Sequence, residues 1–232
     1  MANTPFIWIT GASSGIGKSL TEVLLTHERN VFGTSRREIE LPSNSHNGIF
    51  LPFASDIKKA SDVKKAVDFL STDGRYIDCL INNAGITSFK PAEKDSLDDV
   101  SDIIQTNLLG SIYAIKSVLP DMIKRNSGTI VNILSAVTHK VFAYSSTYSA
   151  SKAGLLAYTD VLREEVRKYN IRVINIIPGA TATPIWSDKI LQEKSDRMMK
   201  PEEVASLIAD LLLTTNSVVP EEIRLKPILG DL

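Results

Sequence analysis

The sequence contains a single cysteine, Cys79, among its 232 residues. One thiol cannot form an internal disulfide, so we expect a protein of a reducing compartment. Histidine is also scarce: His27, His46 and His139 are scattered without the spacing of metal ligands, and we expect no metal site. The Cys79 thiol lies within an apolar run, where we expect it to be buried and inert rather than a nucleophile.

Long hydrophobic runs and an excess of one charge are missing as well. The apolar run Phe6–Ile9 is too short for a secretory signal segment, and no basic region precedes it. No stretch approaches the ~18 apolar residues that a membrane-spanning helix needs. The formal net charge is −1, so bulk charge gives no special attraction to nucleic acid or to an anionic membrane. We therefore expect a soluble, cytoplasmic protein with neither nucleic acid nor membrane as a partner.

The remaining composition is that of an ordinary globular protein. Hydrophobic residues make up 43% and charged residues 23% of the chain, which excludes a disordered, collagenous or coiled-coil protein. A length of 232 residues is about the size of one large domain. We therefore expect one domain over residues 1–232.

Short β-type runs alternate with longer amphipathic stretches along the whole chain. The predicted strands are Pro5–Thr10, Asn30–Ser35, Gly48–Phe53, Ile77–Asn82, Gly128–Ile133, Ile171–Ile177 and Glu222–Lys226. Helical spacing of apolar residues predicts helices over Ser61–Leu70, Leu97–Leu119 and Tyr148–Tyr169, and Pro201 with two acidic residues after it begins another. The alternation predicts an α/β fold, a Rossmann-type doubly wound parallel sheet in a single domain. Ligands of such sheets bind beyond the carboxyl ends of the strands.

Two segments have no clear pattern. The polar stretch Pro42–Asn47 is expected to be a surface loop. The longer segment Pro184–Lys200 is expected to be a mobile flap over a site, since long loops in compact domains are often functional. A surface excursion with one short helix is the alternative for this segment.

The first predicted strand leads into a glycine-rich turn, Thr10-Gly11-Ala12-Ser13-Ser14-Gly15-Ile16-Gly17, after which Lys18-Ser19-Leu20 opens a helix. Glycines in such a turn let backbone amides approach a pyrophosphate, and the helix N-terminus adds partial positive charge. The turn is not a P-loop, because Gly11 lies one residue too far from Gly17-Lys18-Ser19. On its own the turn also fits a tight strand–helix connection.

Further motifs follow in a characteristic order. They are Asn82-Asn83-Ala84-Gly85, Asn107, Ser135, Tyr148-Ser149-Ala150-Ser151-Lys152, and Pro178-Gly179 with Thr183. In this order and spacing the set resembles the short-chain dehydrogenase/reductase family, and the resemblance extends from the glycine turn through Thr183. It implies a dinucleotide cofactor and catalysis within the same domain.

The pair Tyr148 and Lys152 carries the expected chemistry. The two residues are one helical turn apart, so on a helix they share a face. A free tyrosine has a pKa of about 10, and lowering it by ~3 units takes ~4 kcal/mol. A cation about 4 Å away at an effective dielectric of ~20 supplies an interaction of that order. We therefore expect Lys152 to lower the pKa of Tyr148, which acts as the general acid in reduction and the general base in oxidation.

Two more residues complete the predicted catalytic set. Ser135 follows a strand, so its hydroxyl can face the same crevice as Tyr148 and hydrogen-bond a substrate carbonyl oxygen. Asn107 lies inside a helical stretch, where asparagine is a mediocre helix former. The resemblance implies that Asn107 holds a water that links Lys152 to solvent. A structural asparagine that bends the helix is a compatible alternative.

The end of the second strand bears on the choice of cofactor. NAD-binding proteins usually carry an acidic residue there, whereas this strand ends Thr34-Ser35-Arg36-Arg37, with Ser35 where the resemblance places the carboxylate. A guanidinium matches a 2′-phosphate in bidentate fashion, so Arg36, with Arg37 in support, predicts NADP. Two solvated arginines are the alternative.

The resemblance places other cofactor contacts by position. Asp56 would receive the adenine amine, or it would simply cap the next helix. Asn82, Ala84 and Gly85 would line the ribose, while Asn83 would make structural bonds. Near the nicotinamide, Thr183 would hydrogen-bond the carboxamide. The full predicted cofactor set is Gly11, Ser13, Ser14, Gly15, Ile16, Gly17, Ser35, Arg36, Arg37, Asp56, Ile57, Asn82, Ala84, Gly85, Tyr148, Lys152, Pro178, Gly179, Thr181 and Thr183.

The sequence thus predicts an NADP(H)-dependent oxidoreductase that interconverts a carbonyl group and an alcohol, with direct hydride transfer. A non-catalytic NADP-sensing protein of the same fold is one alternative, although it would be expected to lack Tyr148 or Lys152. An epimerase or dehydratase is another, although such relatives usually carry a larger C-terminal substrate domain.

The substrate itself is less well defined. Apolar side chains, among them Phe142, Tyr144, Ile185 and Trp186, are expected to line a pocket for a ketone, aldehyde or oxoacyl compound, and His139 lies nearby. The resemblance also implies a homodimer or homotetramer built on the predicted helices Leu97–Leu119 and Tyr148–Tyr169.

Overall fold

Seven short segments of the chain pair side by side as parallel strands of one sheet. The computed structural model describes residues 4–41, 47–214 and 218–230. The strands are β1 Thr4–Thr10, β2 Val31–Ser35, β3 Phe50–Ala54, β4 Arg75–Asn82, β5 Gly128–Ile133, β6 Ile171–Pro178 and β7 Glu222–Leu225. The predicted strands are confirmed, with ends that differ by no more than two residues.

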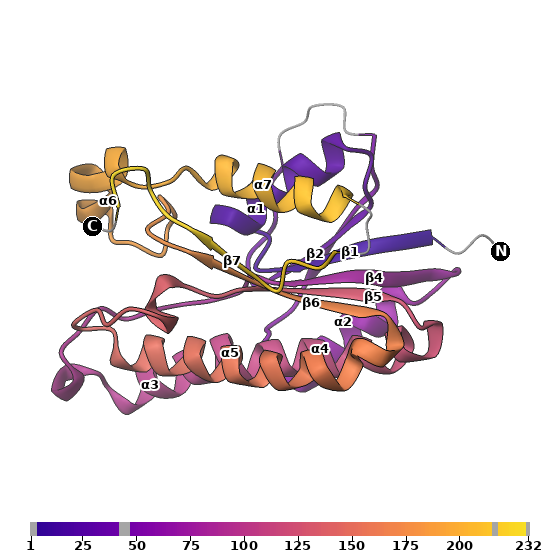
Figure 1. Ribbon diagram of the computed structural model, residues 1–232, viewed down its shortest axis with the longest axis horizontal. Helices are drawn as coiled ribbons and strands as arrows, with labels where there is room; N and C mark the ends of the chain where they lie inside the picture. The colour runs from indigo at the N-terminus through magenta and orange to yellow at the C-terminus, as the bar shows by residue number, and fades with distance from the viewer. Residues whose placement is uncertain (1–3, 42–46, 215–217, 231–232) are drawn as a thin grey trace.

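The strand order is β3-β2-β1-β4-β5-β6-β7, so the chain direction across the sheet reverses between β1 and β4. Helices α1 Gly15–Thr26 and α7 Pro201–Leu213 pack together on one face, whereas α2 Ala60–Leu70, α4 Gly110–Arg125 and α5 Ser146–Val166 cover the other (Figure 1). This arrangement is the Rossmann-type doubly wound sheet that the alternation predicts. The carboxyl ends of β1 and β4 meet at the reversal, where such folds bind ligands.

Each helical layer has its own apolar core against the sheet. Trp8, Phe32 and Leu80 face the layer of α4 and α5, while Leu20 and Leu24 of α1 pack with strand residues on the opposite face. Strand residues on both faces are buried, which explains the continuous apolar runs in the sequence.

The predicted helix Leu97–Leu119 is wrong in its continuity and in its end. It is divided into α3 Leu97–Ile104, a π-helical turn Gln105–Leu109 and α4, and α4 continues past Pro120 to Arg125. The predicted helix Tyr148–Tyr169 is α5 followed by a 3₁₀ turn, Arg167–Tyr169.

The structure describes the two unpatterned segments to different extents. Residues 42–46 of the predicted surface loop lie outside the described residues. Segment 184–200 contains α6 Asp188–Lys194 and a 3₁₀ turn Ser195–Arg197, and α6 lies at the end of the molecule away from the N-terminus (Figure 1). Its local structure therefore includes the short helix of the alternative reading, while its motion stays a prediction.

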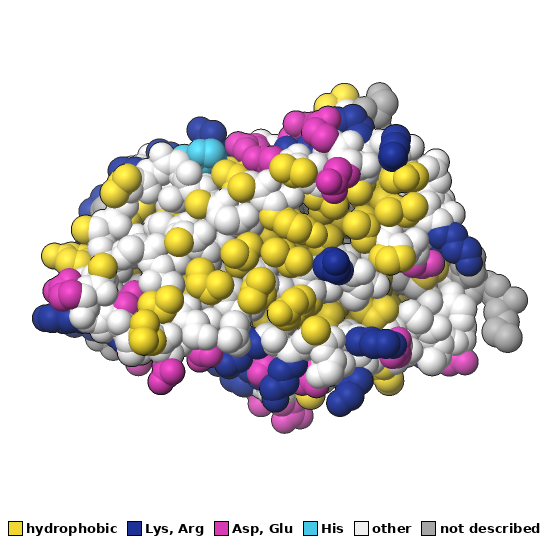
Figure 2. Space-filling view, turned by 90° about the horizontal axis from the view of Figure 1, so that it is seen from below, with side chains coloured by type: hydrophobic (Ala, Val, Ile, Leu, Met, Phe, Trp, Pro, Cys, Tyr) yellow, Lys and Arg dark blue, Asp and Glu magenta, His cyan; other side chains and the backbone are white. Residues whose placement is uncertain are grey.

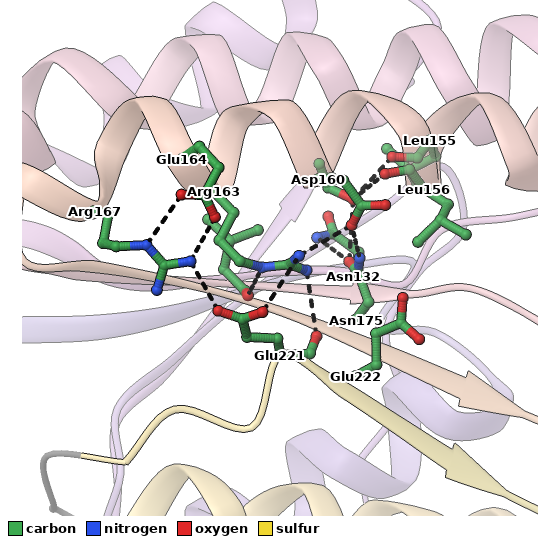
Figure 3. A network of polar contacts seen from close by, with 12 residues as sticks. Asn132, Leu155, Leu156, Asp160, Arg163, Glu164, Arg167, Asn175, Glu221 and Glu222 are labelled. Atoms are coloured by element: carbon green, nitrogen blue, oxygen red, sulfur yellow. Dashed lines mark hydrogen bonds and ion pairs between the residues drawn. The ribbon is translucent and has the colours of Figure 1, made fainter.

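A chain of buried amides crosses the middle of the sheet on the α5 side. Asn82, Asn132 and Asn175 are register partners on β4, β5 and β6. Asn82 Nδ2 donates to Asn132 Oδ1 at 2.9 Å, and Asn132 Nδ2 donates to Asn175 Oδ1 at 3.1 Å. Asn175 Nδ2 then donates to Asp160 Oδ1 of α5 at 3.4 Å, and Arg163 pairs with the same carboxylate at 3.0 Å (Figure 3). The amides therefore join three strands to α5.

Within the described residues, none of the helices combines the length and the apolarity required to span a bilayer. The same part of the chain brings together no cluster of His, Cys, Asp and Glu side chains that could hold a metal ion. The Cys79 thiol is buried, and burial raises its pKa.

Candidate active site

A cavity of about 670 Å³ opens at the carboxyl ends of the strands, around the point where the strand order reverses. It is lined by the predicted site residues Gly11, Ser13, Ser14, Gly15, Ile16, Ser35, Arg36, Arg37, Ile57, Ala84, Gly85, Ser135, Tyr148, Lys152, Pro178, Gly179, Thr181 and Thr183. The cavity thus brings together residues that are far apart in the sequence: Gly11 and Thr183, the first and last of this set, are 172 positions apart. Gly17, Asp56, Asn82 and Asn107 belong to the predicted set but do not line the cavity.

The glycine turn forms one wall of the cavity. Gly11 and Gly15 have φ values of 69° and 54°, in the left-handed region that favours glycine. A Cβ atom on Gly11 would lie 2.8 Å from the Cα of Ala84, so the turn and the end of β4 approach each other closely. Ser14 caps α1 without a side-chain hydrogen bond to its first amides. These amides, at the positive end of the helix, fit a pyrophosphate.

Gly17 has a packing role in this structure. A Cβ atom there would lie 2.3 Å from Nδ2 of Asn83 and 2.5 Å from the oxygen of Gly11. The third glycine of the motif therefore permits close approach of α1 to the turn and to β4, beneath the cavity wall.

Of the adjacent asparagines, Asn82 departs from its predicted role as a ribose-lining residue, whereas Asn83 fulfils its own and also lines the cavity. Asn82 is 2% exposed, belongs to the chain of amides and does not line the cavity, because its side chain points to the α5 side of the sheet. Asn83 lines the cavity and also makes the structural bonds expected of it: Nδ2 donates to the oxygens of Thr10 and Gly11 at 3.0 and 3.1 Å. In return, Thr10 Oγ1 accepts from the Asn83 and Ala84 amides.

Two arginines stand at the end of β2. Arg36 and Arg37 both line the cavity. The Arg37 guanidinium donates to Ser14 Oγ at 2.9 Å, and Ser35 Oγ donates to the main-chain oxygen of Arg37. Arg36 has no hydrogen bond or ion pair within the described residues, and its guanidinium fits a phosphate group at this end of the cavity.

The end of β3 contributes differently from the prediction. Asp56 accepts a hydrogen bond from the Lys58 amide through Oδ1 at 3.2 Å, within its own turn, and α2 begins later, at Ala60. Asp56 is therefore neither a lining residue nor the cap of α2 in this structure. Its neighbours Ser55 and Ile57 line the cavity instead, and the buried Ser55 hydroxyl has no hydrogen-bond partner within the described residues. The position of Ser55 at a strand's carboxyl end is the sequence signal that could have identified it.

Tyr148, Lys152 and Ser135 meet in the wall of the cavity. α5 begins at Ser146, so Tyr148 and Lys152 lie in its first two turns and face the sheet. Lys152 Nζ lies 5.9 Å from the centre of the Tyr148 ring and donates to the Ile133 oxygen at 2.7 Å. Burial lowers the pKa of Lys152 to about 8.

Burial raises the pKa of Tyr148, and a hydrogen bond with Ser135 acts in the opposite direction. The predicted lowering of the Tyr148 pKa by Lys152 is therefore absent from this structure, because removal of the hydroxyl from water outweighs the polar contacts. The protonated hydroxyl is the form present at neutral pH.

Asn107 lies behind the cavity, fully buried in the π-helical turn. Its Oδ1 accepts from the Ile86 amide at 2.9 Å, while Nδ2 donates to the Ile86 oxygen at 2.8 Å and to Ser151 Oγ at 3.0 Å. These bonds join the π turn, the segment after β4 and α5, and they support the structural role. The water-holding role stays a prediction.

The apolar end of the cavity contains Phe142, Ile185 and Trp186, as predicted. Tyr144 and His139 instead line a separate hollow beside it, and His139 Nε2 lies 3.7 Å from a carboxylate oxygen of Glu222.

Phe89 is a lining residue that the sequence did not reveal, and it stacks on Trp186 at 4.9 Å between ring centres. As the first aromatic residue after the Asn82–Gly85 motif it could have been noticed.

Comparison with known proteins gives a consistent family assignment. A sequence model of the family described as short chain dehydrogenase matches residues 5–194. A sepiapterin reductase from Chlorobaculum tepidum is 30% identical over 97% of this chain and 96% of its own. Carbonyl reductase family member 4 from Xenopus laevis is 34% identical over 88% and 89%, respectively.

Solved structures agree in fold. The closed form of a serine dehydrogenase complexed with NADP+ superposes with a TM-score of 0.88 at 25% identity, covering 98% of this chain and 96% of that one. A serine dehydrogenase from Escherichia coli gives a TM-score of 0.83 at 26% identity, covering 98% and 100%.

Proposed function

The chain belongs to the short-chain dehydrogenase family, and from that premise we propose that it is an NADP(H)-dependent oxidoreductase that interconverts a carbonyl group and an alcohol. The observation that carries the proposal is the shared cavity: Ser135, Tyr148 and Lys152 line the same space as the glycine turn and Arg36. Relatives named as reductases, and a similar structure that holds NADP+, support the direction and the cofactor.

The residues around the cavity fit NADP(H). The uncapped amides of α1 suit the pyrophosphate, and Arg36 suits the 2′-phosphate. Ser55, with its buried hydroxyl unpartnered among the described residues, offers a hydrogen bond at the same end. No carboxylate occurs among the described residues that line the cavity, so nothing there opposes the phosphates. When bound, the nicotinamide supplies or accepts the hydride.

Tyr148 and Ser135 would act on the carbonyl oxygen. Burial keeps the Tyr148 hydroxyl protonated, which is the form a proton donor requires. Ser135 would hydrogen-bond the same oxygen and orient it toward Tyr148. The Lys152 ammonium, held by the Ile133 oxygen, places a positive charge near the phenolate that forms as the proton leaves.

A panel of ketones, aldehydes and oxoacyl compounds with NADPH tests this proposal. Steady oxidation of NADPH with formation of an equivalent amount of alcohol is the expected result. Binding of NADPH without net turnover across the panel would instead favour the non-catalytic NADP-sensing protein. Turnover that returns the NADPH unchanged would favour an epimerase or dehydratase.

The outer face of the α4–α5 layer supports an oligomer as part of the proposal. Hydrophobic side chains gather broadly over this face, with charged side chains mainly at its margins (Figure 2). Val161 of α5 is 61% exposed although it lies more than a turn inside a long helix. A face of this kind suits a second copy of the chain, whose matching helices would cover it.

A further inference from the structure

Helix α6 presents two different side chains to the cavity. Ile190 and Lys194 are one helical turn apart and both line it, whereas Lys189 of the same helix does not. The helix thus contributes one apolar residue and one cation to the wall.

The Lys194 ammonium is available for a ligand. Among the described residues it has neither a hydrogen bond nor an ion pair, while Lys152 is bonded to the Ile133 oxygen and Arg37 to the glycine turn. The lining residues that the structure describes include no carboxylate that could neutralise Lys194. A negative group of a bound molecule would therefore be its partner.

Arg36 and Lys194 lie on segments that follow strands far apart in the sheet. Arg36 follows β2, and α6 follows β6, which is four positions away in the strand order. At about 4.8 Å per position these strands are ~19 Å apart. The strands that precede the two cations are thus far apart in the sheet, and Lys194 belongs to the same segment as Trp186.

The cavity that Lys194 lines also has apolar and aromatic lining residues. Phe89 and Trp186 stack with their rings inclined by 9°, and Trp186 Nε1 donates to the Thr181 oxygen at 3.0 Å, which fixes the indole. Phe142 and Ile185 line the same cavity. An apolar carbonyl compound would be held here by contact area, with Lys194 as the one charged group of α6 that meets it.

We propose that the substrate is an anion: a carbonyl compound with an apolar body and a carboxylate or phosphate group that pairs with Lys194. This inference rests on the proposed function. The carbonyl carbon takes a hydride, with oxidation of NADPH to NADP+, and its oxygen takes a proton from Tyr148. The anionic group takes no part in making or breaking bonds.

The test compares each acid with its own uncharged ester. The substrates are 4-oxopentanoate, 5-oxohexanoate and 6-oxoheptanoate, each against its methyl ester, with hydroxyacetone phosphate against hydroxyacetone as the phosphate arm. Their kcat/KM values are measured with saturating NADPH for the wild type, Lys194→Gln and the matched control Lys189→Gln. Substrates of three chain lengths are used so that the distance between the carbonyl carbon and the anionic group varies across the series.

The wild type is expected to prefer the best-fitting anion over its uncharged counterpart by about two- to fivefold, the size of an ion pair with an exposed cation. Lys194→Gln should remove that preference, and Lys189→Gln should keep it. Raising the ionic strength should weaken the wild-type preference, because Lys194 is exposed. Preference for the acids identifies a carboxylate, and preference for hydroxyacetone phosphate identifies a phosphate.

Three results would overturn the inference. If the wild type reduces charged and uncharged compounds equally, the substrate is not selected by charge, while the proposed function stands. If Lys194→Gln instead raises the KM for NADPH with every substrate, the ammonium serves the cofactor. If NADPH is oxidised neither with these compounds nor with the wider carbonyl panel, the proposed function fails together with the inference.

Discussion

Lys152 donates a hydrogen bond to the main-chain oxygen of Ile133 at 2.7 Å, and this bond joins the cavity-lining face of α5 to the end of β5. Ser135 follows two residues after Ile133, so the strand that holds Lys152 also sets the position of Ser135. The ammonium is buried where a carbonyl oxygen compensates only part of its lost hydration, which lowers its pKa to about 8.

Lys152→Met is expected to abolish most turnover, weaken NADPH binding and change how stability depends on pH. Because the folded-state pKa of Lys152 is about 8 and the ordinary value is 10.5, the unfolded chain binds more protons between these values. Stability of the wild type should therefore gain from this group as the pH rises from 8 to 9.5, by up to ~2 kcal/mol. Urea unfolding at several pH values measures the gain, which the variant should lack. Parallel pH profiles for the two proteins would contradict the buried charge.

Tyr148→Phe is expected to lower kcat by about 10²- to 10⁴-fold with little change in NADPH binding, because the ring stays and only the transferable proton is lost. NADPH oxidation and a fluorescence titration measure the two quantities. Tyr158→Phe, on the same helix but outside the cavity lining, is the matched control and should retain activity. Near-normal turnover of Tyr148→Phe would remove this residue from the mechanism.

Arg36→Ala is expected to weaken NADPH by about ten- to a hundredfold and to leave NADH nearly unaffected, since only NADPH carries the 2′-phosphate. Adding Ser35→Asp should then reverse the preference. The comparison variant is Arg37→Ala: because the Arg37 guanidinium bonds Ser14 in the glycine turn, its loss should affect both cofactors alike. The measurement is kcat/KM for each cofactor. Equal losses for both cofactors in Arg36→Ala would make that arginine structural.

Segment 184–200 is proposed to act as a flap that closes over bound ligands. Its amides should exchange hydrogen faster than those of β5 in the free protein, and they should gain protection when NADPH and substrate are added. Hydrogen exchange followed by mass spectrometry provides the comparison. Equal protection in both states would mean that α6 and its neighbours are a fixed surface excursion.

Val161→Glu is expected to dissociate the oligomer, because a carboxylate would be buried in the apolar contact between two α5 helices. Leu207→Glu on α7 is a matched control, since Leu207 is 55% exposed on the opposite layer. Light scattering after size-exclusion chromatography gives the mass of each variant. A monomeric wild type, or loss of the oligomer in Leu207→Glu alone, would place the contact elsewhere or exclude it.

Much of the fold follows from local patterns. Gly128–Ile133 is predicted to the residue, since it begins with a glycine after the polar Asn126-Ser127 and every residue of the strand is buried. Pro201 and the two glutamates after it mark the start of α7, again without error. The turn glycines Gly11 and Gly15 are readable because their backbone angles leave little choice of residue.

What could not be predicted depends on contacts between distant segments. Whether Asn82 or Asn83 faces the cavity is decided by the pleat of β4 and by its neighbours β1 and β5. The π-helical turn that contains Asn107 is accompanied by hydrogen bonds between the Asn107 side chain and Ile86 and Ser151. No local sequence pattern indicates these contacts. Lys194 lines the cavity because of the way α6 lies against it, and nothing in the sequence around Lys194 distinguishes it from Lys189.

The buried amides have a direction that is imposed from the protein surface. An ionised Asp160 can only accept, so Asn175 must turn its NH₂ group toward it and its oxygen toward Asn132. Asn132 and then Asn82 take the same orientation, and Oδ1 of Asn82 is left buried without a partner among the described residues. One carboxylate thus orders three amide dipoles in series. Without that carboxylate, the Thr159 hydroxyl, 3.2 Å from Asn175 Oδ1, would be the remaining side-chain contact of Asn175 outside the row of amides among the described residues, and no ionic group would set the direction of the three dipoles.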